Sequence, residues 1–118
     1  MSQRAVQQHA VGPLLESIRR SLRISQETLA HILKLSVRTI VRWEKEGDEP
    51  PLLERERIEL LYEVVEIAGE VMNLEVIPTW FSTPKEALAG ARPIDLFSSF
   101  RGIQQIREIL ERARWGIF

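Results

Sequence analysis

The sequence predicts an all-α fold: an N-terminal helix-turn-helix bundle, a long connecting helix and a small C-terminal helical domain. Three observations support this prediction. Apolar residues recur at helical spacing along most of the chain, serines and prolines stand where helices would begin, and a pair of prolines interrupts the chain near its middle. With 44% apolar and 28% charged residues, the 118-residue chain has the composition of a globular protein.

Three helices are expected in the first part of the chain. Pro13 suits the first turn of the first helix, which carries apolar residues three and four positions apart. Ser25 is a candidate N-cap for a short second helix, and Ser36 for a third helix over Val37 to Glu46. Gly47 is expected to end the third helix.

The third helix is predicted to have a buried side and a basic side. Ile40 and Trp43 share one face, whereas Arg38 and Arg42 share another. The first 47 residues hold eight basic and four acidic residues, and the remainder holds eight basic and thirteen acidic ones. A basic half suits binding to a polyanion. Judged by charge alone, the charged residues of both halves could equally well lie on ordinary solvent-exposed helix faces. A short basic helix after a tight turn is the arrangement that the DNA major groove accepts.

Residues 25–30 (SQETLA) and 35–44 (LSVRTIVRWE) resemble the Xre and phage-repressor helix-turn-helix family. The resemblance implies that the glutamine opening the second helix contacts a phosphate and that exposed residues of the third helix reach base edges. Lys34 stands where the family often has glycine, and Val37 and Val41 stand where it is often polar; valines can contact thymine methyl groups. The alternative is a degenerate motif kept as a packing unit. The candidate DNA-binding residues are Gln26, Ser36, Val37, Arg38, Thr39 and Arg42.

The run Asp48-Glu49-Pro50-Pro51 is a predicted domain boundary, because paired prolines resist helix formation. We therefore expect a flexible tail at residues 1–12, a DNA-binding domain at 13–51 and a second domain at 52–118. A long helix should follow the boundary, to about Leu74. Its apolar arc is wide enough for two contacts, one within the chain and one with a second copy. The candidate dimer residues are Leu60, Val64, Ile67 and Val71. One wide monomeric core is the alternative.

The last part of the chain is predicted to hold short elements before a final helix. Residues 76–82 look extended, and Thr83 to Glu86 has the pattern of a capping box for a short helix that Gly90 ends. Pro93 suits the start of another single turn. The final helix is expected at about residues 102–115, with Gly116 as its C-terminal stop.

This half resembles the toxin-binding domain shared by the MbcA, ParS and Xre antitoxins. The resemblance is carried by residues 80–81, 83–84, 87–90, 92–96 and 116–118. With the helix-turn-helix first, it implies an antitoxin of a RES-Xre type II toxin-antitoxin system: a homodimer that represses its own operon by binding double-stranded operator DNA, and whose C-terminal region blocks the active site of a RES-domain toxin that consumes NAD. The candidate toxin-binding residues are Trp80, Arg92, Asp95, Arg114, Trp115, Gly116, Ile117 and Phe118. For Trp115 and Phe118 the alternative is closure of the core.

Few residues suit catalysis. The chain has no cysteine and two histidines, His9 and His31, neither at metal-ligand spacing from another histidine. It also lacks a glycine-rich phosphate loop and a nucleophile elbow. We expect no catalytic residue, metal or cofactor and therefore no enzyme. The absence of a long apolar run predicts a cytoplasmic protein without a membrane partner. The alternative function is a solitary helix-turn-helix transcription regulator without a toxin partner.

Overall fold

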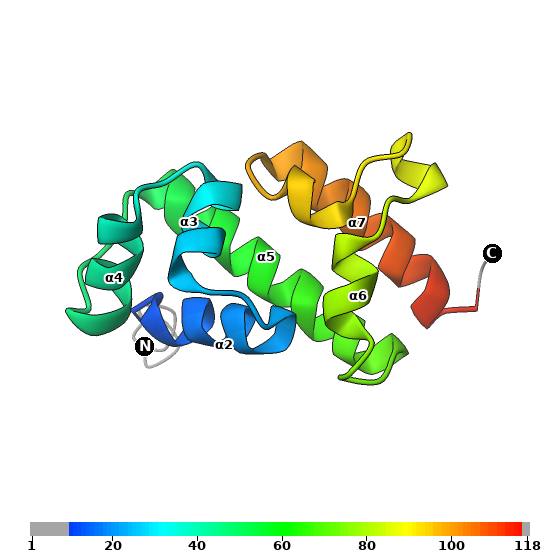
Figure 1. Cartoon of the computed structure of the whole chain (residues 1–118), viewed down its shortest axis with the longest axis horizontal. Helices are drawn as coiled ribbons and strands as arrows, with labels where there is room; N and C mark the ends of the chain where they lie inside the picture. The colour runs from blue at the N-terminus through cyan, green and yellow to red at the C-terminus, as the bar shows by residue number, and fades with distance from the viewer. Residues whose placement is uncertain (1–9, 117–118) are drawn as a thin grey trace, which may run out of the picture.

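The computed structural model describes residues 10–116, which form helices joined by short turns (Figure 1). No strand occurs within these residues, so the predicted all-α fold is confirmed. The elements in chain order are α2 (Gly12–Leu22), α3 (Gln26–Leu33), α4 (Val37–Lys45), α5 (Leu52–Val71), α6 (Ile77–Ser82), the 3₁₀ helices η1 (Glu86–Leu88) and η2 (Pro93–Leu96), and α7 (Phe100–Arg114).

Hydroxyl caps start the two helices of the helix-turn-helix, as expected. The Ser25 Oγ accepts a hydrogen bond from the Thr28 amide at 3.0 Å. The Ser36 Oγ accepts one from the Thr39 amide at 3.1 Å. Each cap satisfies a backbone donor that the first turn leaves without a partner.

The expected flexible tail extends too far into the chain. Val11 and Gly12 are buried, and a Cβ added to Gly12 would lie 2.8 Å from the carbonyl oxygen of Trp43. The start of α2 therefore packs directly against the backbone of α4, and residue 12 belongs to the folded bundle. Residues 1–9 lie outside the described part of the chain.

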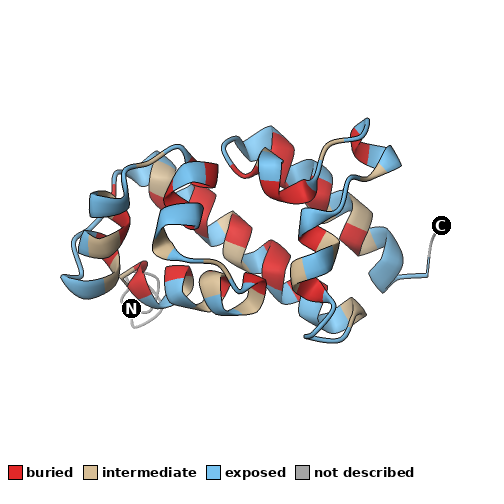
Figure 2. Ribbon diagram, in the orientation of Figure 1, coloured by how far each residue is buried: buried red, intermediate tan, exposed pale blue. Residues whose placement is uncertain are grey.

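Helix α5 is the central element and contacts both α2 and α7. One continuous core surrounds it, from Val11 near the start of the described chain to Leu110 in α7 (Figure 2). Val64 and Ile67, which were expected at a dimer contact, are buried inside this core. The prediction is wrong for these two residues, because α2 and α7 cover both flanks of the wide apolar arc.

The buried guanidinium of Arg57 connects the two halves of the molecule. Its Nη1 donates to the carbonyl oxygens of Leu33, at the end of α3, and Phe97, before α7, at 2.9 and 3.3 Å. Burial lowers the pKa of Arg57 below its usual value, because it penalises the charged form. The boundary expected between residues 51 and 52 thus falls where the connection from α4 to α5 ends, but the hydrophobic core is continuous on both sides of it.

Two expectations for residues 76–86 are wrong. The segment that looked extended is helix α6, in which Ile77 and Phe81 are four residues apart on one buried face. No capping box follows, because the Thr83 hydroxyl donates back to the Thr79 carbonyl oxygen at 2.6 Å and closes α6. The next turn is the 3₁₀ helix η1, which starts only at Glu86.

Helix α7 begins two residues earlier than predicted. The Ser99 Oγ accepts a hydrogen bond from the Gly102 amide at 3.0 Å, so Ser99 is its N-cap. Gly116 has a φ of 72° just after the helix, as its predicted role at the end requires. No helix in residues 10–116 combines the length and apolarity needed to cross a membrane.

Candidate DNA-binding and toxin-binding surfaces

Helix α4 presents a basic outer face and buries an apolar inner one. Ile40 and Trp43 are buried, while Arg38 is exposed and Val37 has 38% of its surface accessible. Val41 is half-buried. The guanidinium at position 38 and the methyl groups at position 37 are therefore free to meet a polar and an apolar group on the same partner.

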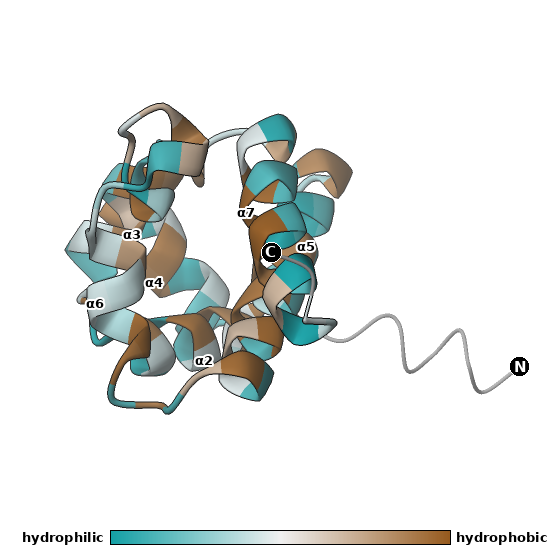
Figure 3. Cartoon of the chain, turned by 90° about the vertical axis from the view of Figure 1, so that its right-hand side faces the viewer, coloured by the Kyte–Doolittle hydropathy of each residue, from teal (hydrophilic) through white to brown (hydrophobic). Residues whose placement is uncertain are grey.

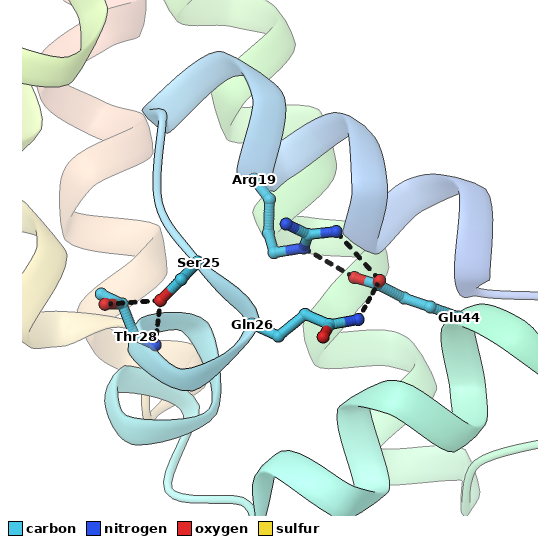
Figure 4. A network of polar contacts seen from close by, with 5 residues as sticks. All are labelled: Arg19, Ser25, Gln26, Thr28 and Glu44. Carbon is cyan, nitrogen blue, oxygen red and sulfur yellow. Dashed lines mark hydrogen bonds and ion pairs between the residues drawn. The ribbon is translucent and has the colours of Figure 1, made fainter.

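An ion-pair network fixes the start of α3 against the end of α4 (Figure 4). The Glu44 carboxylate accepts two hydrogen bonds from the Arg19 guanidinium, at 2.8 and 3.0 Å, and one from the Gln26 amide nitrogen at 2.8 Å. Only 2% of the Glu44 side chain is exposed. The hydrogen bond to Glu44 raises the pKa of Arg19 above its usual value. Gln26 thus serves the packing of the motif as well as lying at its surface.

Sequence reasoning missed Arg19 and Glu44 as part of this site. The available signal was an acidic residue near the end of an otherwise basic helix, which a buried partner on another helix would explain. Ser36 and Thr39, predicted to meet DNA, pair with each other through their hydroxyls at 2.9 Å. In the free chain these two hydroxyls therefore support the N-terminus of α4.

Arg42 is held by an exposed carboxylate. Its Nε donates to the Asp48 Oδ2 at 2.9 Å, and nearly half of each side chain is exposed. Exposed pairs of this kind contribute little stability because solvent screens them. Arg42 can exchange Asp48 for another acceptor at small cost.

The predicted toxin-binding residues lie in separate groups. At the start of η2, the guanidinium of its N-cap residue Arg92 donates two hydrogen bonds of 2.8 Å to the Asp95 carboxylate, and both side chains are about half exposed. On α6, Trp80 is half-buried, meets Phe81 edge to face at 5.0 Å and has the Lys85 Nζ 4.5 Å from its ring centre. Partial burial lowers the pKa of Lys85 below its usual value.

The third group stands at the far end of α7 from η2 (Figure 1). Trp115 is 67% exposed, so it does not close the core. Its indole Nε1 donates to the Glu111 carboxylate at 3.1 Å, and the Arg114 guanidinium lies 5.4 Å from its ring centre. Gly116 is exposed. Ile117 and Phe118 lie outside the described residues.

Residues 10–116 contain no group of three or more His, Asp or Glu side chains placed to hold a metal ion. The described chain is thus a capped helix-turn-helix joined through one core to a helical domain with an exposed aromatic end. These features define a helix-turn-helix protein with a second, C-terminal surface.

Residues 74–116 match the family of the antitoxin Xre/MbcA/ParS C-terminal toxin-binding domain. The resemblance predicted from the sequence is therefore confirmed for this C-terminal part of the chain.

A chain in the crystal structure of the M. tuberculosis MbcT-MbcA toxin-antitoxin complex is similar to this one, with a TM-score of 0.74 and 21% sequence identity. The similarity covers 92% of this chain and 96% of that chain. At this identity the likeness shows a shared fold. No curated protein is significantly similar in sequence.

Proposed function

We propose that this protein is an antitoxin that blocks the active site of a RES-type, NAD-consuming toxin and represses its own operon by binding promoter DNA as a homodimer. The observation that carries the proposal is the family match of residues 74–116, in the same chain as a helix-turn-helix with an exposed basic helix. The MbcT-MbcA crystal structure is described as a toxin-antitoxin complex, which supports a toxin as the partner.

Toxin binding is proposed to use the exposed end of α7 and the η2 pair. Trp115 keeps most of its surface in solvent, and aromatic and arginine side chains dominate binding energy in protein interfaces. The two hydrogen bonds between Arg92 and Asp95 orient both groups on an exposed turn. We further propose that residues 116–118 enter the toxin's active-site cleft.

Operator binding is proposed to use α4 in the major groove. Arg38 and Arg42 would donate to base edges, Val37 would contact a thymine methyl group, and Gln26 would contact a phosphate. Ser36 and Thr39 would mainly hold the helix end that approaches the DNA.

The homodimer needs a contact other than the buried flank of α5. Leu52 and Leu53 are each 67% exposed and start α5 directly after the loop that follows α4. We propose that they meet their counterparts in a second copy, which would place two α4 helices on successive half-sites of an inverted repeat. Half-buried Leu60 and Val71 would have at most a secondary part.

The decisive experiment expresses the full chain together with the product of the neighbouring toxin gene. We expect a stable complex and preserved cellular NAD. A variant lacking residues 116–118 should still dimerise and bind its operator yet protect NAD less well. If the full chain neither binds this gene product nor protects NAD, the protein is a solitary transcription regulator. Full protection by the shortened variant would assign inhibition to the surface from Trp80 to Leu96 instead.

A further inference from the structure

A shallow hollow lies at the C-terminal end of α2, beside the connection between α5 and α6. It is lined by Arg20, Ser21, Arg23 and Leu74. Leu74 is 68% exposed, and Val76 close by in sequence is 45% exposed. The α5–α6 connection is at the lower edge of Figure 3, where much of the chain has the brown colour of hydrophobic residues. The hollow therefore combines two cations with an uncovered apolar rim.

The two cations of the hollow have no carboxylate partner within residues 10–116. In the part of the chain that the structure describes, neither Arg20 nor Arg23 forms an ion pair, and both are exposed. By contrast, Arg19 on the same helix is committed to Glu44. Two guanidinium groups that line one hollow with an exposed leucine fit a partner segment that carries a carboxylate next to an apolar side chain.

The apolar lining of the hollow and its link to the matched domain favour a protein over DNA as that partner. The start of α2 abuts α4, where Gly12 faces the backbone of Trp43 and Glu44. Arg20 lies in the last turn of α2 and Arg23 directly after it, and α2 contacts α6 as well as α4. Leu74 and Val76 would also bury little apolar surface against a phosphate backbone. Moreover, Leu74 is the first residue of the matched toxin-binding domain, so the hollow is continuous with that domain.

We propose that this hollow seats an acidic and apolar segment of the toxin, so that the toxin contacts α2 of the helix-turn-helix unit as well as the C-terminal domain. This inference rests on the proposed antitoxin function. The carboxylate of the segment pairs with Arg20 and Arg23, and its apolar neighbour covers Leu74. Because the hollow is open and charged, the pairing acts chiefly on the association rate and is weakened by salt.

The test measures binding of the purified product of the neighbouring toxin gene to full-length variants. Reversal of both charges, Arg20→Glu with Arg23→Glu, should lower toxin affinity at least about tenfold and reduce the salt dependence of association. Leu74→Ser should lower the affinity without altering the salt dependence. Lys45→Glu is the control, because Lys45 is an exposed helical cation outside residues 74–116 without an ion pair in the described chain, and it should leave toxin affinity within about twofold.

Operator affinity and sedimentation of the same variants test whether DNA or a second copy of the chain occupies the hollow instead. Unchanged toxin binding by the doubly reversed variant overturns the proposal. A loss confined to operator binding would identify a phosphate contact, and a loss of the dimer would identify a contact with a second copy; either result also overturns it. If the reversed variant fails to fold, Arg20→Gln with Arg23→Gln gives the same readouts. Failure of the wild-type chain and of Lys45→Glu to bind the toxin would reject the antitoxin function itself.

Discussion

Three residues other than glycine adopt the left-handed conformation in residues 10–116: Arg23, Lys34 and Ala89. Lys34 ends α3 with a φ of 61°, and its amide donates to the carbonyl oxygens of Ala30 and His31. The turn of the helix-turn-helix thus keeps its geometry although a lysine replaces the glycine that is frequent there. The conformational cost of a left-handed lysine is about 1 kcal/mol, which the packing of α3 and α4 exceeds.

Two glycines in helices should respond oppositely to alanine. A Cβ at Gly102 would lie 2.4 Å from the Leu96 carbonyl oxygen, so Gly102→Ala should lower the free energy of unfolding by about 1–3 kcal/mol. Gly69 has no atom within 4 Å of an added Cβ, and Gly69→Ala should raise it by about 0.5–1 kcal/mol. Urea unfolding of both variants measures the difference. Equal effects would mean that η2 and α7 are not in close contact.

At the scale of single elements, η2 carries an exposed side-chain pair that makes a small, pH-dependent contribution to stability. Hydrogen bonding from Arg92 holds the pKa of Asp95 below its usual range. The pKa of Asp95 is therefore lower in the folded chain than in the unfolded chain, where it is about 4. The pair contributes its full stability above the unfolded-state pKa, and this contribution is lost as the pH falls through the folded-state pKa.

The predicted consequence is a pH-dependent difference between wild type and Asp95→Asn. Wild type should have the higher melting temperature at about pH 7, and the two should converge as the pH approaches about 2, because both then lack the charge. Thermal unfolding followed by circular dichroism measures the gap. A gap that persists in acid would show that the carboxylate charge is not what stabilises η2.

Helix α4 carries the prediction for operator recognition. Arg38→Ala and Arg42→Ala should each cost about 1–3 kcal/mol of operator binding and relax one base position, whereas Gln26→Ala should weaken binding to all sequences alike. Asp48→Asn should strengthen binding, because it releases Arg42. Footprinting and titration at fixed salt measure these effects. Unchanged operator affinity in both arginine variants would exclude α4 as the reading helix.

At the scale of the whole molecule, we expect substitutions at the exposed start of α5 and on its buried flank to have different effects on the dimer and on folding. Leu52→Asp with Leu53→Asp should give a folded monomer, because both side chains are solvent-exposed in the single chain. Val64→Asp should unfold the chain, because it buries an unpaired charge. Sedimentation and circular dichroism separate the outcomes. A doubly substituted variant that remains dimeric would place the interface elsewhere.

Local chemistry made the helix-turn-helix predictable. The hydroxyl caps at Ser25 and Ser36, Pro13 in a first turn and the apolar spacing of α4 each act within a few residues, so they can be recognised in the sequence. The same logic failed at Thr83, where two local hydrogen-bond patterns compete. The hydroxyl closes the preceding helix instead of opening the next one.

The all-α class, the starts of the early helices and the resemblance to the antitoxin family could be predicted from the sequence, because they depend on periodicity, caps and motifs. The buried flank of α5, the partners of Glu44 and Arg57 and the exposure of Trp115 became known from the folded chain. The physical reason is that these outcomes depend on contacts between residues far apart along the chain. An amphipathic pattern specifies that a face will be covered, whereas packing of the whole chain selects what covers it.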